Sequence, residues 1–169
     1  MSSDRDPRRP LAALYLMLLL AWPAAAAFPE PWLATPLPKV STLWLTADDK
    51  QQIQQLLGVP YQGLRIRYWR GATDSAWVLE AIGKERPITF GVVVRQQAIV
   101  ALEVLAYRES RGGEIRHAPF RAQFEQARLT PDGRLDRTID GITGATMSVD
   151  ASRNMARLAL WLDARVRQP

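Results

Sequence analysis

The segment from Asp140 to Ser148 reads Asp-Gly-Ile-Thr-Gly-Ala-Thr-Met-Ser and is arranged to present one hydroxyl group, that of Thr146. Gly144 and Ala145 leave little side-chain bulk on the approach to this threonine, and glycine also permits positive φ angles or the close approach of another molecule. This hydroxyl could therefore meet an approaching molecule as a nucleophile. A threonine hydroxyl is a weak nucleophile without an activating base, and none is evident nearby, so a separate enzyme would have to supply one.

A long helix is predicted directly after this segment, because apolar residues recur there at helical spacing. These residues are Ala151, Met155, Leu158, Ala159, Leu162 and Val166. Ser148 is the expected N-cap, and Asp150 would lie in the first turn, where negative charge is favourable. Thr146 would then lie just before a helix N-terminus, which is a favourable place for a phosphate group.

Residues 140–148 resemble the Asp-x-Ser/Thr-Gly-Ala-Thr signature of the FMN-binding domain family. That family includes the flavin-carrying subunits of the sodium-pumping NADH:quinone oxidoreductase and of related membrane electron-transport complexes. In the family, the last threonine of the signature carries FMN through a phosphoester bond, and the matching residue here is Thr146. The resemblance implies that a flavin transferase attaches the FMN, with FAD as the donor and AMP as the second product.

A second segment of the chain resembles the same family. Tyr107–Glu114, followed by Phe120 and Gln123-Phe124, is similar to the Glu-Ser-x-Gly-x-Glu…Gln-Phe segment that precedes the signature, and the resemblance covers roughly residues 82–155. It implies cofactor-binding roles for residues of both segments. These residues are Asp140, Gly141, Ile142, Thr143, Gly144, Ala145, Met147, Ser148, Glu109, Ser110, Gly112 and Gly113.

The sequence leaves the roles of some of these residues open. The turn Glu109–Gly113 would place backbone N–H groups near the flavin ring, or its glycines would serve only the geometry of the loop. Asp140 would be a recognition handle for the transferase and its metal, or a turn former. Trp69, beside Gly71 at a strand end, is the first candidate for stacking on the ring, although large aromatic residues more often pack in a core.

The N-terminal residues have the composition of a secretory signal peptide. Three arginines within residues 1–9 precede an apolar run over residues 11–22, and residues 24–27 are four alanines suited to cleavage. This run of about a dozen residues is shorter than the roughly 20 that a membrane-spanning helix needs. We therefore expect a periplasmic or otherwise exported protein, with or without membrane association, whose mature N-terminus is Phe28. The alternative is an uncleaved apolar segment that anchors the protein to the membrane.

Charge and composition narrow the function classes. Cleavage would leave 142 of the 169 residues, which is enough for one domain, and would lower the formal net charge from +5 to +4. The basic residues alternate with acidic ones and no nucleic-acid reading element is recognisable, so we expect no nucleic-acid partner. A basic face could instead meet an acidic protein or anionic lipid headgroups.

The chain has no cysteine and a single histidine, His117. This composition excludes disulfides, cysteine-bound iron–sulfur clusters and multi-histidine metal sites within the chain, and we expect no metal site. Redox chemistry would therefore have to come from a bound cofactor, and a flavin would supply it.

The middle of the chain predicts one helix followed by several strands. Residues 28–45, which contain four prolines, are expected to form an extended N-terminal segment, and the FMN-binding domain is expected to span residues 46–169. Thr46 begins a helix that Gly58 ends, and Pro119 begins a short helix later. Strands are predicted over residues 64–69, 76–82, 88–94 and 98–106. This order favours an α+β fold, with an antiparallel sheet and helices packed against it in a single small domain.

Three functions of different classes fit the sequence. The first is an exported electron-transfer protein that carries FMN on Thr146 and exchanges electrons with a membrane redox protein. The second is a redox-sensing or assembly module that uses the same flavin, and the third is a flavin-free binding module of the same fold. We therefore expect an electron carrier, a subunit or a binding protein more than a stand-alone enzyme.

Overall fold

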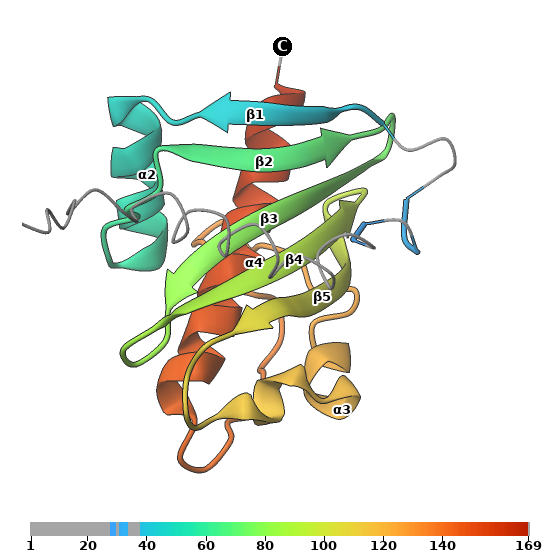
Figure 1. Cartoon of the computed structure of the whole chain (residues 1–169). Helices are drawn as coiled ribbons and strands as arrows, with labels where there is room; N and C mark the ends of the chain where they lie inside the picture. Colours follow the sequence, from blue (N-terminus) through green and yellow to red (C-terminus); the bar gives the residue numbers. More distant parts are fainter. Residues whose placement is uncertain (1–27, 30, 34–37, 169) are drawn as a thin grey trace, which may run out of the picture.

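The computed structural model describes residues 28–29, 31–33 and 38–168, so the predicted signal peptide lies outside the described residues. The described part contains five strands and three α-helices (Figure 1). In chain order they are β1 (Val40–Trp44), α2 (Ala47–Leu57), β2 (Arg65–Arg70), β3 (Asp74–Ile82), β4 (Pro87–Arg95), β5 (Ala98–Tyr107), a 3₁₀ helix η2 (Gly113–Arg116), α3 (Ala118–Ala122) and α4 (Thr146–Arg167).

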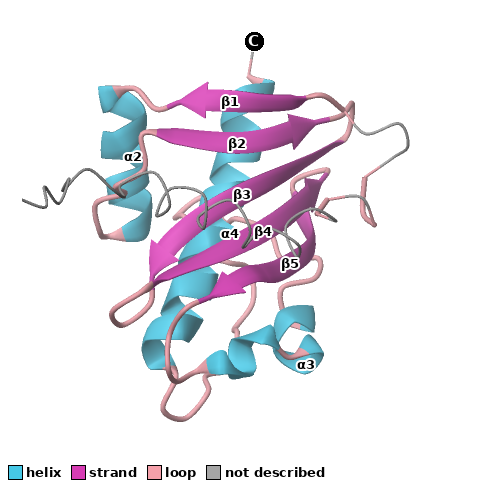
Figure 2. Cartoon of the chain, viewed as in Figure 1, coloured by secondary structure: helices cyan, strands magenta, loops and turns pink. Residues whose placement is uncertain are grey.

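The strands form one antiparallel sheet in the order β1-β2-β3-β4-β5, which confirms the α+β expectation (Figure 2). Each strand pairs with the next one in the chain, so short connections join β2 to β5, whereas α2 lies between β1 and β2. β3 and β4 pair along their whole length, whereas β2 pairs with β3 only from Arg67 to Arg70. The four predicted strands correspond to β2 to β5, but β1 was not expected as a strand.

The helix α2 begins and ends at the residues that its sequence predicts. The Thr46 hydroxyl accepts a hydrogen bond from the Asp49 N–H at 3.1 Å, and the Asp49 carboxylate accepts one from the Thr46 N–H at 3.0 Å. These two bonds form a capping box. At the other end, Gly58 takes a φ of 74°, which glycine adopts without steric cost.

The main core lies between the sheet and α4, which passes behind the sheet in Figure 1. Trp77 and Phe90 from the central strands and Leu158 and Leu162 from α4 are fully buried there. A second, smaller cluster covers the opposite face of the sheet. In it, Phe28 packs against the β-strand residues with only 5% of its surface exposed.

A buried carboxylate fixes the C-terminal half of α4 to the sheet. Asp163 is fully buried and accepts hydrogen bonds from the Ser75 hydroxyl at 2.6 Å, the Arg167 guanidinium at 2.9 Å and the Gln97 amide. The Ser75 oxygen in turn accepts a hydrogen bond from the Trp77 indole N–H at 2.7 Å. Because a buried charge is tolerated only when it is paired and hydrogen-bonded, this network defines the position of α4 against β3.

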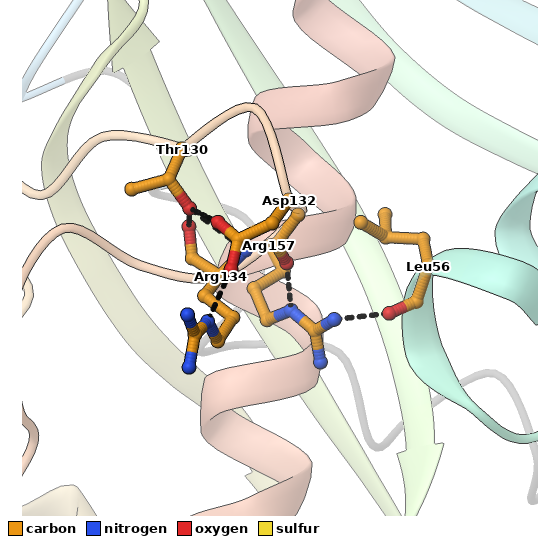
Figure 3. A network of polar contacts seen from close by, with 6 residues as sticks. Leu56, Thr130, Asp132, Arg134 and Arg157 are labelled. Atoms are coloured by element: carbon orange, nitrogen blue, oxygen red, sulfur yellow. Dashed lines mark hydrogen bonds and ion pairs between the residues drawn. The ribbon is translucent and has the colours of Figure 1, made fainter.

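Arg157 ties the middle of α4 to two other parts of the chain (Figure 3). Its guanidinium donates to the Gly133 carbonyl at 2.6 Å and to the Leu56 carbonyl at the end of α2. Gly133 belongs to a turn at residues 130–133, where its N–H donates to the Thr130 carbonyl at 2.8 Å. Arg157 therefore anchors the long segment that leads to Asp140.

Replacing Arg157 with leucine is expected to lower the free energy of unfolding by about 2 kcal/mol, because two backbone carbonyls lose a charged donor. Denaturant unfolding followed by tryptophan fluorescence measures this change. Arg134→Gln is the matched control, since the Arg134 side chain is 80% exposed in the same turn, and we expect a change within about 0.5 kcal/mol. An equal loss in both variants would contradict the anchoring role.

Candidate functional site

Thr146 is the first residue of α4, and it is exposed. The prediction that Ser148 caps the helix is wrong, because Ser148 lies inside the first turn and is only 4% exposed. The prediction that Asp150 lies in the first turn is also wrong, because Asp150 lies beyond that turn, which contains no acidic residue. No side chain caps the helix start, and the first intrahelical bond runs from the Val149 N–H to the Ala145 carbonyl at 3.0 Å. The N–H groups of the first turn are therefore available to an external acceptor.

A tight turn precedes this helix start. The Ala145 N–H donates to the Ile142 carbonyl at 2.9 Å, and Gly144 inside the turn has a φ of 79°. A Cβ atom at Gly141 or Gly144 would meet no atom within 4 Å. The glycines therefore border open space, and only Gly144 is required by its backbone conformation.

Polar contacts hold the beginning of the signature in place. The Gln123 side-chain oxygen accepts a hydrogen bond from the Asp140 N–H at 2.7 Å. Arg153 on α4 donates to the Ile139 carbonyl and also pairs with Asp150, at 3.0 Å. The Asp140 side chain is exposed, so both roles predicted for it remain predictions.

The structure brings the second predicted segment, residues 107–114, against the start of α4. The Tyr107 hydroxyl donates to the Arg111 carbonyl and lies 3.1 Å from the Ser148 hydroxyl. Gly112 is buried with a φ of 82°, and a Cβ atom there would lie 3.0 Å from the Ser148 oxygen and 3.1 Å from the Ala145 Cβ atom. Only glycine fits at this position, and it lets the two segments touch.

The carboxylate of Glu109 points to a different part of the fold. It accepts hydrogen bonds from the N–H groups of Glu85 at 2.7 Å and Arg86 at 2.8 Å, in the turn between β3 and β4. These bonds, first from Arg86 and then from Glu85, hold the pKa of the Glu109 carboxyl below its usual range. The glutamate therefore joins the β3–β4 turn to the loop that packs on α4.

The lowered pKa of Glu109 predicts a local pH dependence. The stabilising bonds are fully formed above the unfolded-state value of about 4.3 and are lost as the pH falls through the lower folded-state pKa. The amide signals of Glu85 and Arg86 should then titrate together below pH 4.3 in NMR spectra, and Glu109→Gln should remove this titration. Titration of these amides at or above the usual glutamate value would contradict the assignment.

Two cavities lie near the start of α4. One is lined by residues just before Thr146 in the chain, and the other by residues just after it. The smaller has a volume of about 580 Å³ and is lined by Thr143, Gly144 and the loop residues Glu109 to Gly113. Its remaining lining is mostly polar or charged: Tyr107, Glu114, Arg116 and His117. The structure thus places six of the predicted cofactor-binding residues around one polar cavity: Glu109, Ser110, Gly112, Gly113, Thr143 and Gly144.

The larger cavity is a groove of about 1460 Å³ that includes Met147 in its lining. Next to the first turns of α4 its walls are largely apolar, and they include Leu57, Val59, Pro60, Tyr61 and Met155. Removal of the Tyr61 hydroxyl from water raises its pKa to about 12, so this hydroxyl is protonated at neutral pH. The groove opens where β2 and β3 are no longer paired.

No sequence pattern points to these groove residues. Leu57 to Tyr61 lie 86 to 90 residues before Met147 in the chain, and only the fold brings them beside it. Trp69, the predicted stacking residue, belongs to the cluster on the sheet face away from α4 and lies edge-on to Phe28, with ring centroids 6.1 Å apart. It also lines the wide groove that contains Met147, so its stacking role stays a prediction.

The fold and site define a small α+β protein whose exposed, uncapped helix start suits a ligand that bears a phosphate group. Residues 83–161 match the model of the FMN-binding domain family, the family whose signature residues 140–148 resemble. The matched residues run from the end of β3 into α4 and include both predicted segments. This match supports a flavin-binding protein with FMN as its cofactor. No curated protein matches the chain significantly. No helix among the described residues combines the length and hydrophobicity that crossing a membrane requires.

Proposed function

We propose that this protein is an exported electron-transfer flavoprotein that carries FMN as a phosphoester on Thr146. The observation that supports this most directly is the exposed, uncapped start of α4 within the family match. The N–H groups of Thr146, Met147 and Ser148 can donate to phosphate oxygens, and the helix dipole favours the negative charge there.

Attachment would use FAD and a flavin transferase. The Thr146 Oγ atom would form a bond to the phosphorus atom of the FMN half, the pyrophosphate bond would break, and AMP would leave. The transferase would accept the hydroxyl proton, because threonine needs an activating base. The exposure of Thr146 and the open space around Gly141 and Gly144 leave room for a second protein to reach the hydroxyl.

The linings of the two cavities suit different parts of the same FMN molecule. The polar cavity beside Thr143 and Gly144 suits the phosphate and hydroxyl groups. The apolar walls beside Met147 suit the flat ring system, because ligand pockets are mostly apolar with a few polar groups that set orientation. In this arrangement Tyr61 would orient the ring, and the Gly112–Gly113 loop would support the start of α4.

Bound FMN can pass electrons singly or in pairs, so it suits a junction between two redox partners. The chain itself supplies binding, orientation and shielding. Since it contains no cysteine, it offers no thiolate or iron–sulfur ligand of its own. The predicted export signal makes a membrane redox protein the natural donor or acceptor. A redox-sensing or assembly module that uses the same flavin is the second candidate function.

Co-expression with a flavin transferase tests the first part of the proposal. One flavin per chain should remain after denaturation and desalting, and peptide mapping should place it in the peptide that contains residues 140–153. Stopped-flow absorbance with the membrane partner then tests the second part. Reduction or reoxidation faster than by dissolved oxygen, with rates that fall as salt rises, supports electron transfer. A flavin that instead changes only the partner's assembly supports the sensing module.

A further inference from the structure

The sheet face opposite α4 carries an unusual combination of exposed residues. Trp44 and Val40 on the edge strand β1 are 64% and 47% exposed. Their register partners on β2 are Arg65 and Trp69, and directly paired residues point to the same face. The Arg65 guanidinium lies over the Trp44 ring, 5.8 Å from its centroid. β1 therefore presents aromatic, aliphatic and cationic groups together.

The pairing partners of the β2 residues show which side chains lie on this face. Trp69 pairs with Ala76, and both belong to the small cluster around Phe28, whereas Ile66 and Trp77 belong to the core under α4. Alternation along β2 then places Arg65 and Arg67 on the Phe28 side. The wide groove extends onto this side, because its lining includes Arg67, Trp69 and Arg108. We call this surface, with Val40, Trp44, Arg65, Arg67 and Arg108, the basic–aromatic face.

Charge on this face is positive. Two of its carboxylates are already paired, Asp74 with Arg95 at 3.5 Å and Glu103 with Arg121. The third carboxylate, Glu80, accepts a hydrogen bond from the Thr89 hydroxyl at 3.0 Å, and the face also carries Arg65, Arg67 and Arg108. A positive surface of this kind is complementary to an anionic one.

We infer that the basic–aromatic face binds the surface of an anionic lipid bilayer. Tryptophan is enriched at the level of the lipid headgroups, and arginines near the surface are attracted to anionic headgroups. An exposed tryptophan beneath an arginine on the edge strand of the sheet fits that boundary better than it fits a purely aqueous surface. An acidic protein would satisfy the arginines but would not require Trp44 and Val40 to be exposed.

The position of Phe28 supports the same orientation. Phe28 is buried on this face, and a Cβ atom at Gly91 beneath it would come within 2.6 Å of its ring. The mature N-terminus that the sequence predicts, Phe28, therefore lies on the face that we assign to the bilayer. α4 lies on the opposite face, which leaves Thr146 open to a transferase or a redox partner while the protein is bound.

Sedimentation with lipid vesicles tests this inference. Protein from the exported fraction, with its N-terminus defined by mass, would be mixed with vesicles of phosphatidylcholine and with vesicles that also contain phosphatidylglycerol. We expect binding only to the anionic vesicles, and Arg65→Gln should weaken it about 5-fold, the change expected for one surface arginine. Arg134→Gln on the far side removes the same charge and should leave binding unchanged.

A second measurement separates a bilayer contact from simple charge attraction. Trp44 is the most exposed tryptophan of the described residues, so its emission should shift to the blue on binding to the anionic vesicles, and Trp44→Ser should remove the shift and weaken binding. Equal losses in the Arg65 and Arg134 variants, equal binding to neutral vesicles, or no binding at all would overturn the inference. Association with an acidic protein but not with vesicles would also overturn it.

Discussion

Replacing Thr146 with valine is expected to abolish covalent attachment of FMN. Valine has the shape of threonine but lacks the Oγ atom that would bond to phosphorus. Because Thr146 is exposed at the first position of α4 and caps nothing, the free energy of unfolding should change by less than about 0.5 kcal/mol. The loss of flavin can then be attributed to the missing oxygen and not to unfolding.

Flavin fluorescence of the denatured protein on a gel, after co-expression with the transferase, measures this effect. Thr146→Ser is the control, since it keeps the hydroxyl and should retain attachment at a reduced rate. Flavin that survives denaturation in the valine variant would place the ester elsewhere. Thr143 would then be the first alternative because it is exposed, whereas Ser148 is 4% exposed and lies next to Tyr107.

The elements that sequence reasoning predicted correctly are those with local signals. The capping box of Thr46 with Asp49, the stop at Gly58 and the Val- and Ile-rich runs of β4 and β5 all act within a few residues. The antiparallel fold followed from their order. The strand β1 was missed because its five residues have no strong pattern of their own and depend on pairing with β2.

The helix start shows why the site itself was harder to predict. Ser148 is a good capping residue by type, but its hydroxyl lies beside that of Tyr107, 41 residues away, and the helix begins two residues earlier. Such a contact between distant residues overrides a local preference. The apolar groove beside Met147 is likewise formed by residues after α2, and no sequence pattern links them.

Contacts between distant residues also determine where the loop Glu109–Gly113 lies. Sequence reasoning connected this loop to the signature through a family resemblance, and the structure brings the two into contact. Its glutamate, however, hydrogen-bonds the β3–β4 turn, and Gly112 is needed because the start of α4 leaves no room for a side chain. Whether these residues also touch the cofactor stays a prediction that flavin-loaded protein would test.

Replacing Gly112 with alanine is expected to lower the free energy of unfolding by about 2–4 kcal/mol, the sum of backbone strain and overpacking. The backbone there has a φ of 82°, and the new Cβ atom would lie 2.9 Å from the Tyr107 hydroxyl. That hydroxyl cannot move freely because it is bonded to the Arg111 carbonyl. The start of α4 would have to shift, so attachment of flavin to Thr146 should slow as well.

Gly58→Ala is a matched control for the cost of backbone strain at a glycine with positive φ. Gly58 has a similar φ of 74° but meets no atom within 4 Å, so alanine there should cost only the strain of about 1–2 kcal/mol. Denaturant unfolding of the two variants therefore separates strain from crowding. Tyr107→Phe removes the oxygen that the new Cβ atom meets first, so combining it with Gly112→Ala should destabilise less than the two single changes added together. Additive losses, or equal losses for the two glycine variants, would mean that Gly112 serves only its own turn and does not set how closely the loop approaches Thr146.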